Sequence, residues 1–512
     1  MRLKLLKKKN KSNKSADFAD TYDLVVEAKK RKQIALTNGH CMFEFPAEGR
    51  IDQSLISPNA LNVIKDLRSR GFKAYIVGGC VRDLLLGKEP KDFDVTTTAT
   101  PKQIVGSVRH CRARVIGRRF KIVHCVFGTP GNEEIIEVAT FRSKYVGEAA
   151  DNGFIIHDNN YGTDIVEDSC RRDYTVNSMY YSPVSDTIYD LHGGYYDLME
   201  NTIDIIGDPV VRIFEDPARI IRAYRFVAKL GFSISDRTLA GFRDNFSLIK
   251  NINNSRLFEE VNKFFLGGYG RRSYEVLRES GILKYFLTEQ GVVYDSDFFD
   301  EFISESLKRS DERYREGKPN MPAFLYAVLL WPLIDSLTRK LILRVGQSKE
   351  KKDIVAVITQ KVLTSQNLIT NIPATVQAII VNILTLQTEM EYGKDGVNNP
   401  DQIVASKFFR AAVDFLKLRA AFDDALADAA MSWNEDYNLR SRNHEAKGDT
   451  KKKQRGRKSS KAKKNAKPAE AAEKATAQKK KGGSDKNNDK KRRIRKERRN
   501  KKAIISAASH SF

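Results

Sequence analysis

The feature that most constrains this chain is the stretch AYIVGGCVRDLLLGKEPKDFDVTTT, which spans residues 74–98. An apolar run leads into a glycine pair, Gly78-Gly79, and after a turn the chain reaches Asp92-Phe93-Asp94. The β-branched residues that follow favour a strand. Because residues two apart on a strand point to the same face, Asp92 and Asp94 are predicted to project together, roughly 6–7 Å apart at the backbone.

This combination indicates transfer of a phosphoryl or nucleotidyl group. Two neighbouring carboxylates repel each other unless a cation lies between them, and magnesium is a hard cation that prefers oxygen ligands. A glycine pair after a strand exposes backbone N–H groups and lets a phosphate approach closely. Each motif alone has a simpler explanation, since Asp-x-Asp is usually a solvated strand edge or turn, and Gly-Gly is a weaker signal still.

In this order, with Arg82 and Asp83 between them, the two motifs resemble the nucleotidyltransferases whose head domain is common to bacterial poly(A) polymerases and CCA-adding tRNA enzymes. The family pattern GGxxRD followed by DxD is matched by residues 78–83 and 92–94, with Cys80 where a third glycine is often found. The two motifs in this order are more specific than either one alone.

The resemblance implies a catalytic site in this stretch. Asp92 and Asp94 are expected to be catalytic and to hold Mg²⁺, with Mn²⁺ as the alternative ion. Gly78 and Gly79 are expected to hold the triphosphate of ATP, the expected substrate. The implied fold is α+β: a nucleotidyltransferase head with a mixed β-sheet and helices, followed by an all-α neck and body and a disordered basic C-terminal tail.

Two residues compete for the third carboxylate of the site. Glu137 lies near the centre of a predicted strand over residues 134–142, where it faces either the metal or solvent. Asp173 ends an Arg-Arg-Asp sequence and has the simpler explanation of a helix cap. In the family this sequence is the third head motif, and its aspartate is counted among the essential carboxylates. Asp173 is therefore predicted to be catalytic, and Glu137 is kept as the alternative.

Further residues are predicted to contact the nucleotide. Arg142 ends a predicted strand, and its planar guanidinium suits phosphate oxygens. The neck motif of the family, EDPxRxxRAxRF, matches residues 215–226, and it implies that Asp216 and Arg219 hydrogen-bond the base edge. The full predicted set is Gly78, Gly79, Arg82, Asp83, Arg142, Arg172, Asn177, Asp216, Arg219 and Arg222.

The segment ARVIGRRFKIVHCVF at residues 113–127 bears on the substrate. Its alternation from Phe120 onward predicts a strand, and an ordinary hairpin with a basic turn explains it equally well. It also resembles the segment that distinguishes bacterial poly(A) polymerases from CCA-adding enzymes. The resemblance implies template-independent addition of AMP to RNA 3′ ends in mRNA processing and RNA decay. The 3′-hydroxyl would attack the α-phosphate of ATP in a two-metal-ion site with release of pyrophosphate. A CCA-adding tRNA nucleotidyltransferase and a non-catalytic RNA-binding protein are the alternatives.

The chain is too long for one core, so several domains are expected. Residues 1–50 are expected to be weakly ordered apart from a helix near residues 20–32. Beyond residue 267 only helices are expected, the last over residues 402–430. The predicted parts are a basic N-terminal extension (1–56), a catalytic head (57–190), a helical neck for base recognition (191–266), a helical RNA-binding body (267–439) and a low-complexity basic tail (440–512).

The net charge of +24 is concentrated in two segments. Residues 451–502 contain 25 Lys/Arg and 5 Asp/Glu, and residues 1–15 contain 7 Lys/Arg and no acidic residue, so the remainder is near neutral. A cationic tail attracts polyanions by releasing counterions. We expect the tail to bind RNA, although a solvated tail or a contact with acidic lipid would have the same composition.

The remaining sequence features concern location and partners. No stretch of 18 apolar residues is present and no apolar signal region follows the N-terminus, so no transmembrane helix is predicted. The five cysteines are scattered without a CxxC pair, which favours a reducing cytoplasm over a disulfide framework. RNA 3′ ends and ATP are the expected partners, with RNA-decay factors as further candidates.

Overall fold

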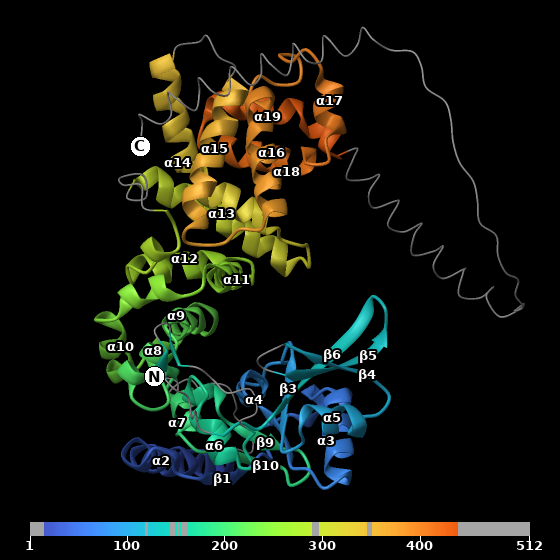
Figure 1. Ribbon diagram of the computed structural model, residues 1–512, viewed down its shortest axis with the longest axis vertical. Helices are drawn as coiled ribbons and strands as arrows, with labels where there is room; N and C mark the ends of the chain where they lie inside the picture. The colour runs from blue at the N-terminus through green and yellow to red at the C-terminus, as the bar shows by residue number, and fades with distance from the viewer. Residues whose placement is uncertain are drawn as a thin grey trace, which may run out of the picture. The chain divides into compact units, whose positions relative to one another are not determined.

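The computed structural model describes residues 15–117, 121–143, 149–150, 153–154, 161–288, 296–345 and 351–438. The chain divides into two compact units, Met1–Ile252 and Asn253–Phe512. The first combines a β-sheet with helices, and the described part of the second contains helices and no strand (Figure 1). The expected basic turn at residues 118–120 and the tail beyond residue 440 lie outside the described residues.

The first unit is built on a mixed eight-stranded sheet. Its order is β1-β10-β9-β2-β3-β6-β5-β4. Only β3 and β6 pair in parallel; all other neighbours in this sheet are antiparallel. The strands in chain order are β1 (Phe43–Pro46), β2 (Ala74–Val77), β3 (Phe93–Thr97), β4 (Arg112–Ile116), β5 (Ile122–Thr129), β6 (Asn132–Thr140), β9 (Tyr180–Ser182) and β10 (Thr187–Asp190), and β7 (Ala149–Ala150) pairs with β8 (Gly153–Phe154) outside it. The expected α+β class is confirmed.

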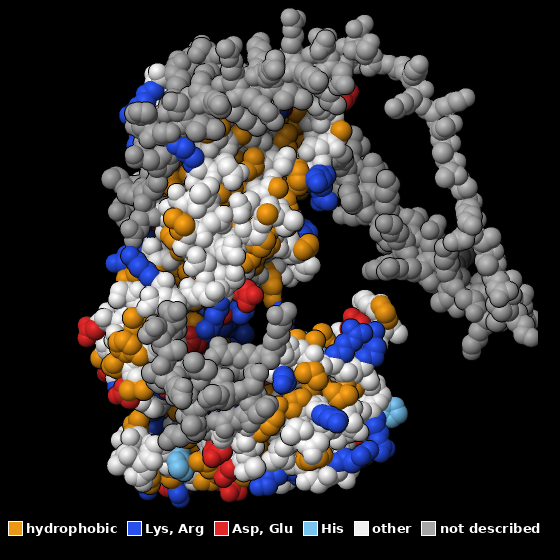
Figure 2. All heavy atoms as spheres, in the orientation of Figure 1, with side chains coloured by type: hydrophobic (Ala, Val, Ile, Leu, Met, Phe, Trp, Pro, Cys, Tyr) orange, Lys and Arg blue, Asp and Glu red, His pale blue; other side chains and the backbone are white. Residues whose placement is uncertain are grey.

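Helix α3 (Pro58–Ser69) packs on the central strands β2 and β3 of this sheet, and α5 (Pro101–Ser107) packs on β4, β5 and β6. Each begins with proline after a capping residue, Ser57 and Thr100, as expected for these sequences. Alternate residues of β5, from Val123 to Phe127, are buried, whereas the residues between them remain partly exposed. The sheet therefore has one covered and one open face here, and in Figure 2 hydrophobic and basic side chains lie over this part of the molecule.

The expectation of weak order up to residue 50 is wrong for residues 15–50. Helix α2 extends over Ser15–Asn38, and β1 joins the edge of the main sheet by pairing with β10. The face of α2 that packs inward is formed by Ala28, Ala35 and a buried Lys32. The helix expected near residues 20–32 is present and extends further in both directions. Small residues and a lysine on its inner face do not resemble a core-facing stripe, so the local pattern does not show that this helix packs on the fold.

The rest of the first unit is mainly helical. Its elements are α4 (Gly79–Leu85), α6 (Ile165–Cys170), α7 (Gly194–Met199), α8 (Pro209–Glu215), α9 (Ala218–Leu230) and α10 (Asp236–Arg243). Helix α9 follows Pro217 and ends at Gly231, which has a φ of +73°, as its sequence predicts. The expectation of an all-α neck is only partly met, because β11 (Thr202–Ile203) and β12 (Ser233–Ile234) form a short parallel pair.

The second unit is helical throughout its described residues. The helices are α11 (Asn254–Phe265), α12 (Gly270–Glu279), α13 (Asp297–Arg315), α14 (Pro322–Val345), α15 (Lys351–Asn367), α16 (Ala374–Met390), α17 (Pro400–Ala405), α18 (Phe409–Ala420) and α19 (Ala427–Ser432). The single helix expected over residues 402–430 is wrong. The chain leaves the helix at Ser406, whose hydroxyl accepts from the N–H of Phe408 at 3.2 Å. The break lets Phe409 pack on Trp433. None of the described helices is long and apolar enough to cross a membrane.

Candidate active site

The centre of the candidate site is Asp94 on β3. Asp92 immediately precedes this strand, and Glu137 lies directly beside Asp94 on the parallel strand β6. The pKa of the Asp94 carboxyl is raised to about 6, chiefly by burial and also by the charges of Glu137 and Asp92, against the opposing charge of Arg172. Asp92 and Glu137 therefore both lie near enough to Asp94 for their charges to disfavour its ionisation.

This arrangement fits a hard divalent cation. The available donors are carboxylate oxygens, and a cation between them would relieve the repulsion that raises the pKa of Asp94. Within the described residues no group of three or more His, Cys, Asp or Glu side chains is placed to hold a metal ion by itself. Magnesium commonly takes only one or two protein carboxylates and completes its shell with phosphate oxygens and water. Asp92 and Asp94 are sufficient for such a site.

The glycine pair lies directly against these carboxylates. Gly78 connects β2 to α4 with a φ of +86°, and a Cβ atom there would lie 3.7 Å from Arg172 Nη1 and 4.0 Å from Asp94 Oδ2. The N–H of Gly78 is donated to the carbonyl of Met179 at 3.2 Å. The N–H of Gly79 belongs to the first turn of α4, where a helix leaves its N–H groups without partners of its own.

Three residues predicted to contact the nucleotide lie close together and are joined by hydrogen bonds to one another: Arg82, Asp83 and Asn177. The buried Arg82 guanidinium donates to Asn177 Oδ1 at 2.5 Å and to Asp83 Oδ1 at 2.7 Å, and it lies 5.6 Å from the ring centre of Phe226. These contacts tie the glycine turn to the segment after Asp173 and to α9. Arg82 and Asn177 therefore support the turn at the glycine pair.

Arg172 is positioned by Asp168, a residue that the sequence motifs did not reveal. Its Nη2 lies 2.9 Å from Asp168 Oδ2, and its Nε donates to the hydroxyl of Tyr180 at 3.0 Å. Asp168 also accepts from the backbone N–H of Arg142 at 3.3 Å. Although burial opposes it, Arg172 and Arg171 hold the pKa of the Asp168 carboxyl far below its usual range. The signal was an acidic residue three and four positions before two arginines.

Asp173 has different neighbours from those of Asp94. It lies 3.0 Å from Arg219 Nε and 2.5 Å from Arg222 Nη1. Burial raises the pKa of its carboxyl, but the two arginines outweigh this effect and hold the pKa below its ordinary value. The carboxylate next to Asp94 is Glu137, and Asp173 is an anchor for the neck arginines.

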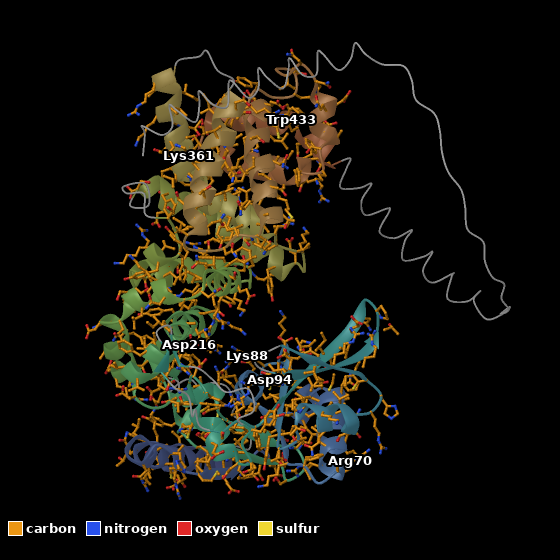
Figure 3. The ribbon with its side chains drawn as sticks, viewed as in Figure 1. Arg70, Lys88, Asp94, Asp216, Lys361 and Trp433 are labelled. Carbon is orange, nitrogen blue, oxygen red and sulfur yellow. The ribbon has the colours of Figure 1, made fainter. Side chains whose placement is uncertain are left out.

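The neck motif is fastened to the Arg-Arg-Asp sequence by further contacts. Arg212 Nη2 donates to the carbonyls of Arg171 and Arg172 at 2.9 and 2.8 Å. Glu215 accepts from Arg219 Nη1 at 3.0 Å. Asp216 ends α8, and its Oδ1 caps α9 by accepting from the N–H of Ala218 at 3.1 Å. Figure 3 shows Asp216 together with Asp94 in the first unit.

Fold and site together define a nucleotidyltransferase head. The Poly A polymerase head domain profile matches residues 74–204. A profile described as the probable RNA and SrmB-binding site of polymerase A matches residues 231–291, and the arginine-rich C-terminus of polymerase A matches residues 347–470. The chain belongs to the poly(A) polymerase family, as its sequence motifs indicated.

Similar proteins agree with this assignment. Poly(A) polymerase I of Salmonella typhimurium is 39% identical over 390 residues, which cover 73% of this chain and 80% of the relative. Poly(A) polymerase I of Haemophilus influenzae is 36% identical over 392 residues, covering 74% and 84%. A CC-adding tRNA nucleotidyltransferase of Halalkalibacterium halodurans is 31% identical over 309 residues, covering 60% and 70%. The likeness to the CCA-adding side of the family is therefore more distant.

Solved structures show the same fold. The crystal structure of the Bacillus stearothermophilus CCA-adding enzyme in complex with CTP matches with a TM-score of 0.53 at 22% identity, covering 75% of this chain and 83% of that one. A tRNA-processing enzyme in an apo form matches with a TM-score of 0.51 at 21% identity, covering 75% and 93%.

Proposed function

We propose that this enzyme is a poly(A) polymerase that adds AMP from ATP to RNA 3′ ends without a template and releases pyrophosphate. The observation that carries the proposal is the group of carboxylates around Asp94, placed against Gly78 in a head that matches poly(A) polymerases. A phosphate cradle and a metal-binding carboxylate pair are the parts that nucleotidyl transfer needs.

Asp92 and Asp94 are the proposed ligands of Mg²⁺, with Mn²⁺ as the alternative. When bound, such ions make an attacking hydroxyl more acidic and neutralise the charge that develops on the leaving pyrophosphate. Glu137 adds a third negative charge beside Asp94. Asp173 is proposed to be essential through a different route, because it orients the arginines that face the base.

The triphosphate is proposed to bind where the glycine pair meets Arg172. Gly78 leaves room for an anion, the first turn of α4 offers N–H groups from Gly79 onward, and Arg172 supplies a fixed positive charge. Arg82 and Asn177 hold this turn in place, and Arg142 shares the Asp168 carboxylate with Arg172.

Base recognition is proposed for Asp216 and Arg219. Arg219 Nε is directed at Asp173, and its Nη1 at Glu215 and the carbonyl of Arg212, while Nη2 makes no hydrogen bond within the described part of the chain. A guanidinium fixed on two sides presents its remaining donors in one direction, which favours a single base edge. Arg222 holds the other oxygen of Asp173.

The RNA is proposed to contact the helical body and the basic tail as well as the head. The RNA-binding profile over residues 231–291 supports this, and its description supports a protein partner too, for which we propose an RNA-decay factor.

We also propose a division of the chain into extension, head, neck, body and tail, with boundaries at residues 56, 190, 266 and 439. A cytoplasmic location is proposed as well, because the five free cysteines favour a reducing compartment.

A single-nucleotide extension assay tests the function. Purified protein, Mg²⁺ and an unstructured RNA are supplied with each nucleoside triphosphate in turn, beside a tRNA that lacks its CCA end. Long products with ATP alone on the unstructured RNA are expected. Addition limited to C, C and A on the tRNA would make this a CCA-adding enzyme, and absence of any incorporation would favour a non-catalytic RNA-binding protein.

A further inference from the structure

The sheet face that carries Asp94 continues beyond the site across three more strands. The cross-strand partners in this row are Glu137 on β6, His124 on β5 and Arg114 on β4. His124 Nε2 lies 3.3 Å from Glu137 Oε1, and the two side chains are 27% and 47% exposed. Because neighbouring strands are about 4.8 Å apart, Arg114 is about 14 Å from Asp94 at the backbone.

Aliphatic side chains on both sides of this row are incompletely covered, and together they form the apolar strip of this face. Ile135 and its partner Val126 lie on one side of the row, and Ile116 and its partner Ile122 lie on the other. Ile135 and Ile116 are 43% and 45% exposed, and Val126 and Ile122 are only partly buried. The opposite face of β5 is closed, as the fully buried Val123 shows. On β5 the exposure is therefore confined to the face that leads to the catalytic carboxylates, whereas the edge strand β4 is exposed on both faces, with Val115 46% exposed on the other one.

Two arginines border the apolar strip. Arg112 and Arg114 are two apart on β4 and therefore share the face. Arg112 is paired with Glu133, whereas Arg114 is exposed and makes no ion pair within the described residues. The charge along the row therefore changes from negative at Asp94 and Glu137 to positive at Arg114.

We propose that this open face seats the last nucleotides of the RNA whose 3′-hydroxyl is extended. The open face is defined by Arg114, Ile116, Ile122, His124, Val126 and Ile135. This inference rests on the proposed function, since it assigns a surface to the substrate of that reaction.

Three observations favour RNA as the occupant. The aliphatic strip offers apolar contact to unstacked bases, and Arg114 offers a positive charge to a backbone phosphate or a plane on which a base can stack. The row ends at Asp94, where the attacking 3′-hydroxyl must lie. A protein partner or a second copy of the chain would use the apolar strip but would give no reason for a row that leads into the site.

The test compares the RNA and ATP kinetics of Arg114→Ala. Removing the cation that neutralises one backbone phosphate is expected to raise the KM for RNA about tenfold and to reduce the salt slope of RNA binding by about 0.7. The KM for ATP and the kcat at saturating RNA are expected to stay unchanged, and Arg114→Lys is expected to restore the salt slope. Ile135→Glu places a carboxylate on the strip and is expected to raise the KM for RNA as well.

Arg70→Ala is the matched control, because Arg70 is an exposed arginine at the end of α3 that lies away from Asp94 in Figure 3. Unchanged RNA kinetics in both face variants would overturn the proposal, and a change in sedimentation without a change in RNA kinetics would identify the face as a contact between copies. If the wild-type protein incorporates no AMP, the proposed function fails, and equilibrium binding of RNA to the same variants still decides the role of the face.

Discussion

Asp94 on β3 and Glu137 on β6 are direct neighbours in the only parallel pair of the main sheet within the described residues. Their proximity helps to raise the pKa of Asp94. Asp173, which the family resemblance designates as an essential carboxylate, is paired with Arg219 and Arg222. Substitution of Glu137 and substitution of Asp173 are therefore expected to affect the reaction in different ways.

Glu137→Gln is expected to weaken the binding of the catalytic metal. Removing one negative charge beside Asp94 should raise the half-saturating Mg²⁺ concentration about tenfold, which corresponds to about 1.4 kcal/mol. Asp173→Asn is the comparison: it should leave the Mg²⁺ dependence unchanged and raise the KM for ATP, because Arg219 loses the charge that orients it. A Mg²⁺ titration of AMP incorporation checks both. A reversed pattern would place Asp173 at the metal.

Asp92→Ala and Asp94→Asn are expected to abolish AMP incorporation while RNA affinity is kept. Residues that merely support a metal ligand commonly cost 10–100-fold when lost, so losing a ligand should cost more than about 100-fold. Because burial and neighbouring charges disfavour ionised Asp94, the neutral asparagine should not lower the Tm. Incorporation close to the wild-type rate in either variant would refute the metal assignment.

Truncation after Arg440 is expected to weaken RNA binding and to flatten its salt dependence. The removed part carries 25 Lys/Arg against 5 Asp/Glu within residues 451–502, and the salt slope on single strands falls by about 0.7 for each phosphate that is no longer neutralised. The rate at saturating RNA should stay the same, because the carboxylates around Asp94 are untouched. Filter binding at several salt concentrations measures the slope, and an unchanged slope would exclude the tail from RNA binding.

Local sequence signals predicted much of the fold. The strand after Asp92 was predicted from its β-branched residues and is present. The start of α3 at Ser57-Pro58 and the end of α9 at Gly231 likewise depend on neighbours within a few residues. The break at Ser406 was missed, because nothing in the local pattern shows that Phe409 packs on Trp433. Such errors are expected wherever tertiary packing outweighs helical propensity.

The candidate site shows the same division. The Asp-x-Asp pair and the glycine pair were visible as motifs. The position of Glu137 next to Asp94 depends on the strand order of the sheet, which no motif encodes. The hydrogen bond from Arg82 to Asn177, 95 residues away in sequence, is also a long-range contact that no local pattern predicts. Sequence identified the chemical groups, and the fold determined which of them meet.

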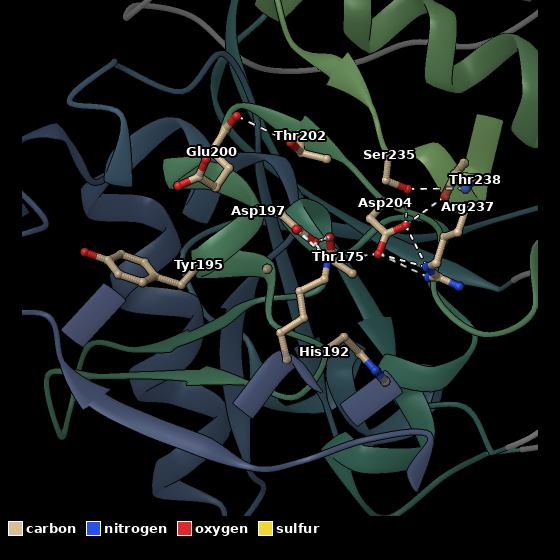
Figure 4. A network of polar contacts seen from close by, with 12 residues as sticks. Thr175, His192, Tyr195, Asp197, Glu200, Thr202, Asp204, Ser235, Arg237 and Thr238 are labelled. Atoms are coloured by element: carbon tan, nitrogen blue, oxygen red, sulfur yellow. Dashed lines mark hydrogen bonds and ion pairs between the residues drawn. The ribbon is translucent and has the colours of Figure 1, made fainter. Parts of the chain in front are cut away.

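Lys32→Met is expected to destabilise the first unit strongly. Lys32 Nζ is buried between Asp197 and Asp204, with 2.9 Å to Asp204 Oδ2, and Asp197 also accepts from Thr175 beside the Arg-Arg-Asp sequence (Figure 4). Removing this cation leaves two buried carboxylates close together with Arg237, which contacts Asp204, as the positive charge that remains, and breaking a buried ion pair typically costs about 3–5 kcal/mol. Chemical denaturation followed by circular dichroism measures the loss. A loss below about 1 kcal/mol would mean that water reaches the pair.

Asp197→Asn provides the control and a test of pH dependence. The pKa of Asp197 is raised to about 7, chiefly by burial and also by the charge of the neighbouring Asp204, although Lys32 opposes both effects. Because the folded state then holds a proton that the unfolded state releases, this carboxyl makes the wild-type protein less stable as the pH rises from about 4 to about 7. Asp197→Asn should remove that decline and, combined with Lys32→Met, should recover part of the lost stability. Equal pH profiles of wild type and Asp197→Asn would show that Lys32 keeps Asp197 ionised throughout this range.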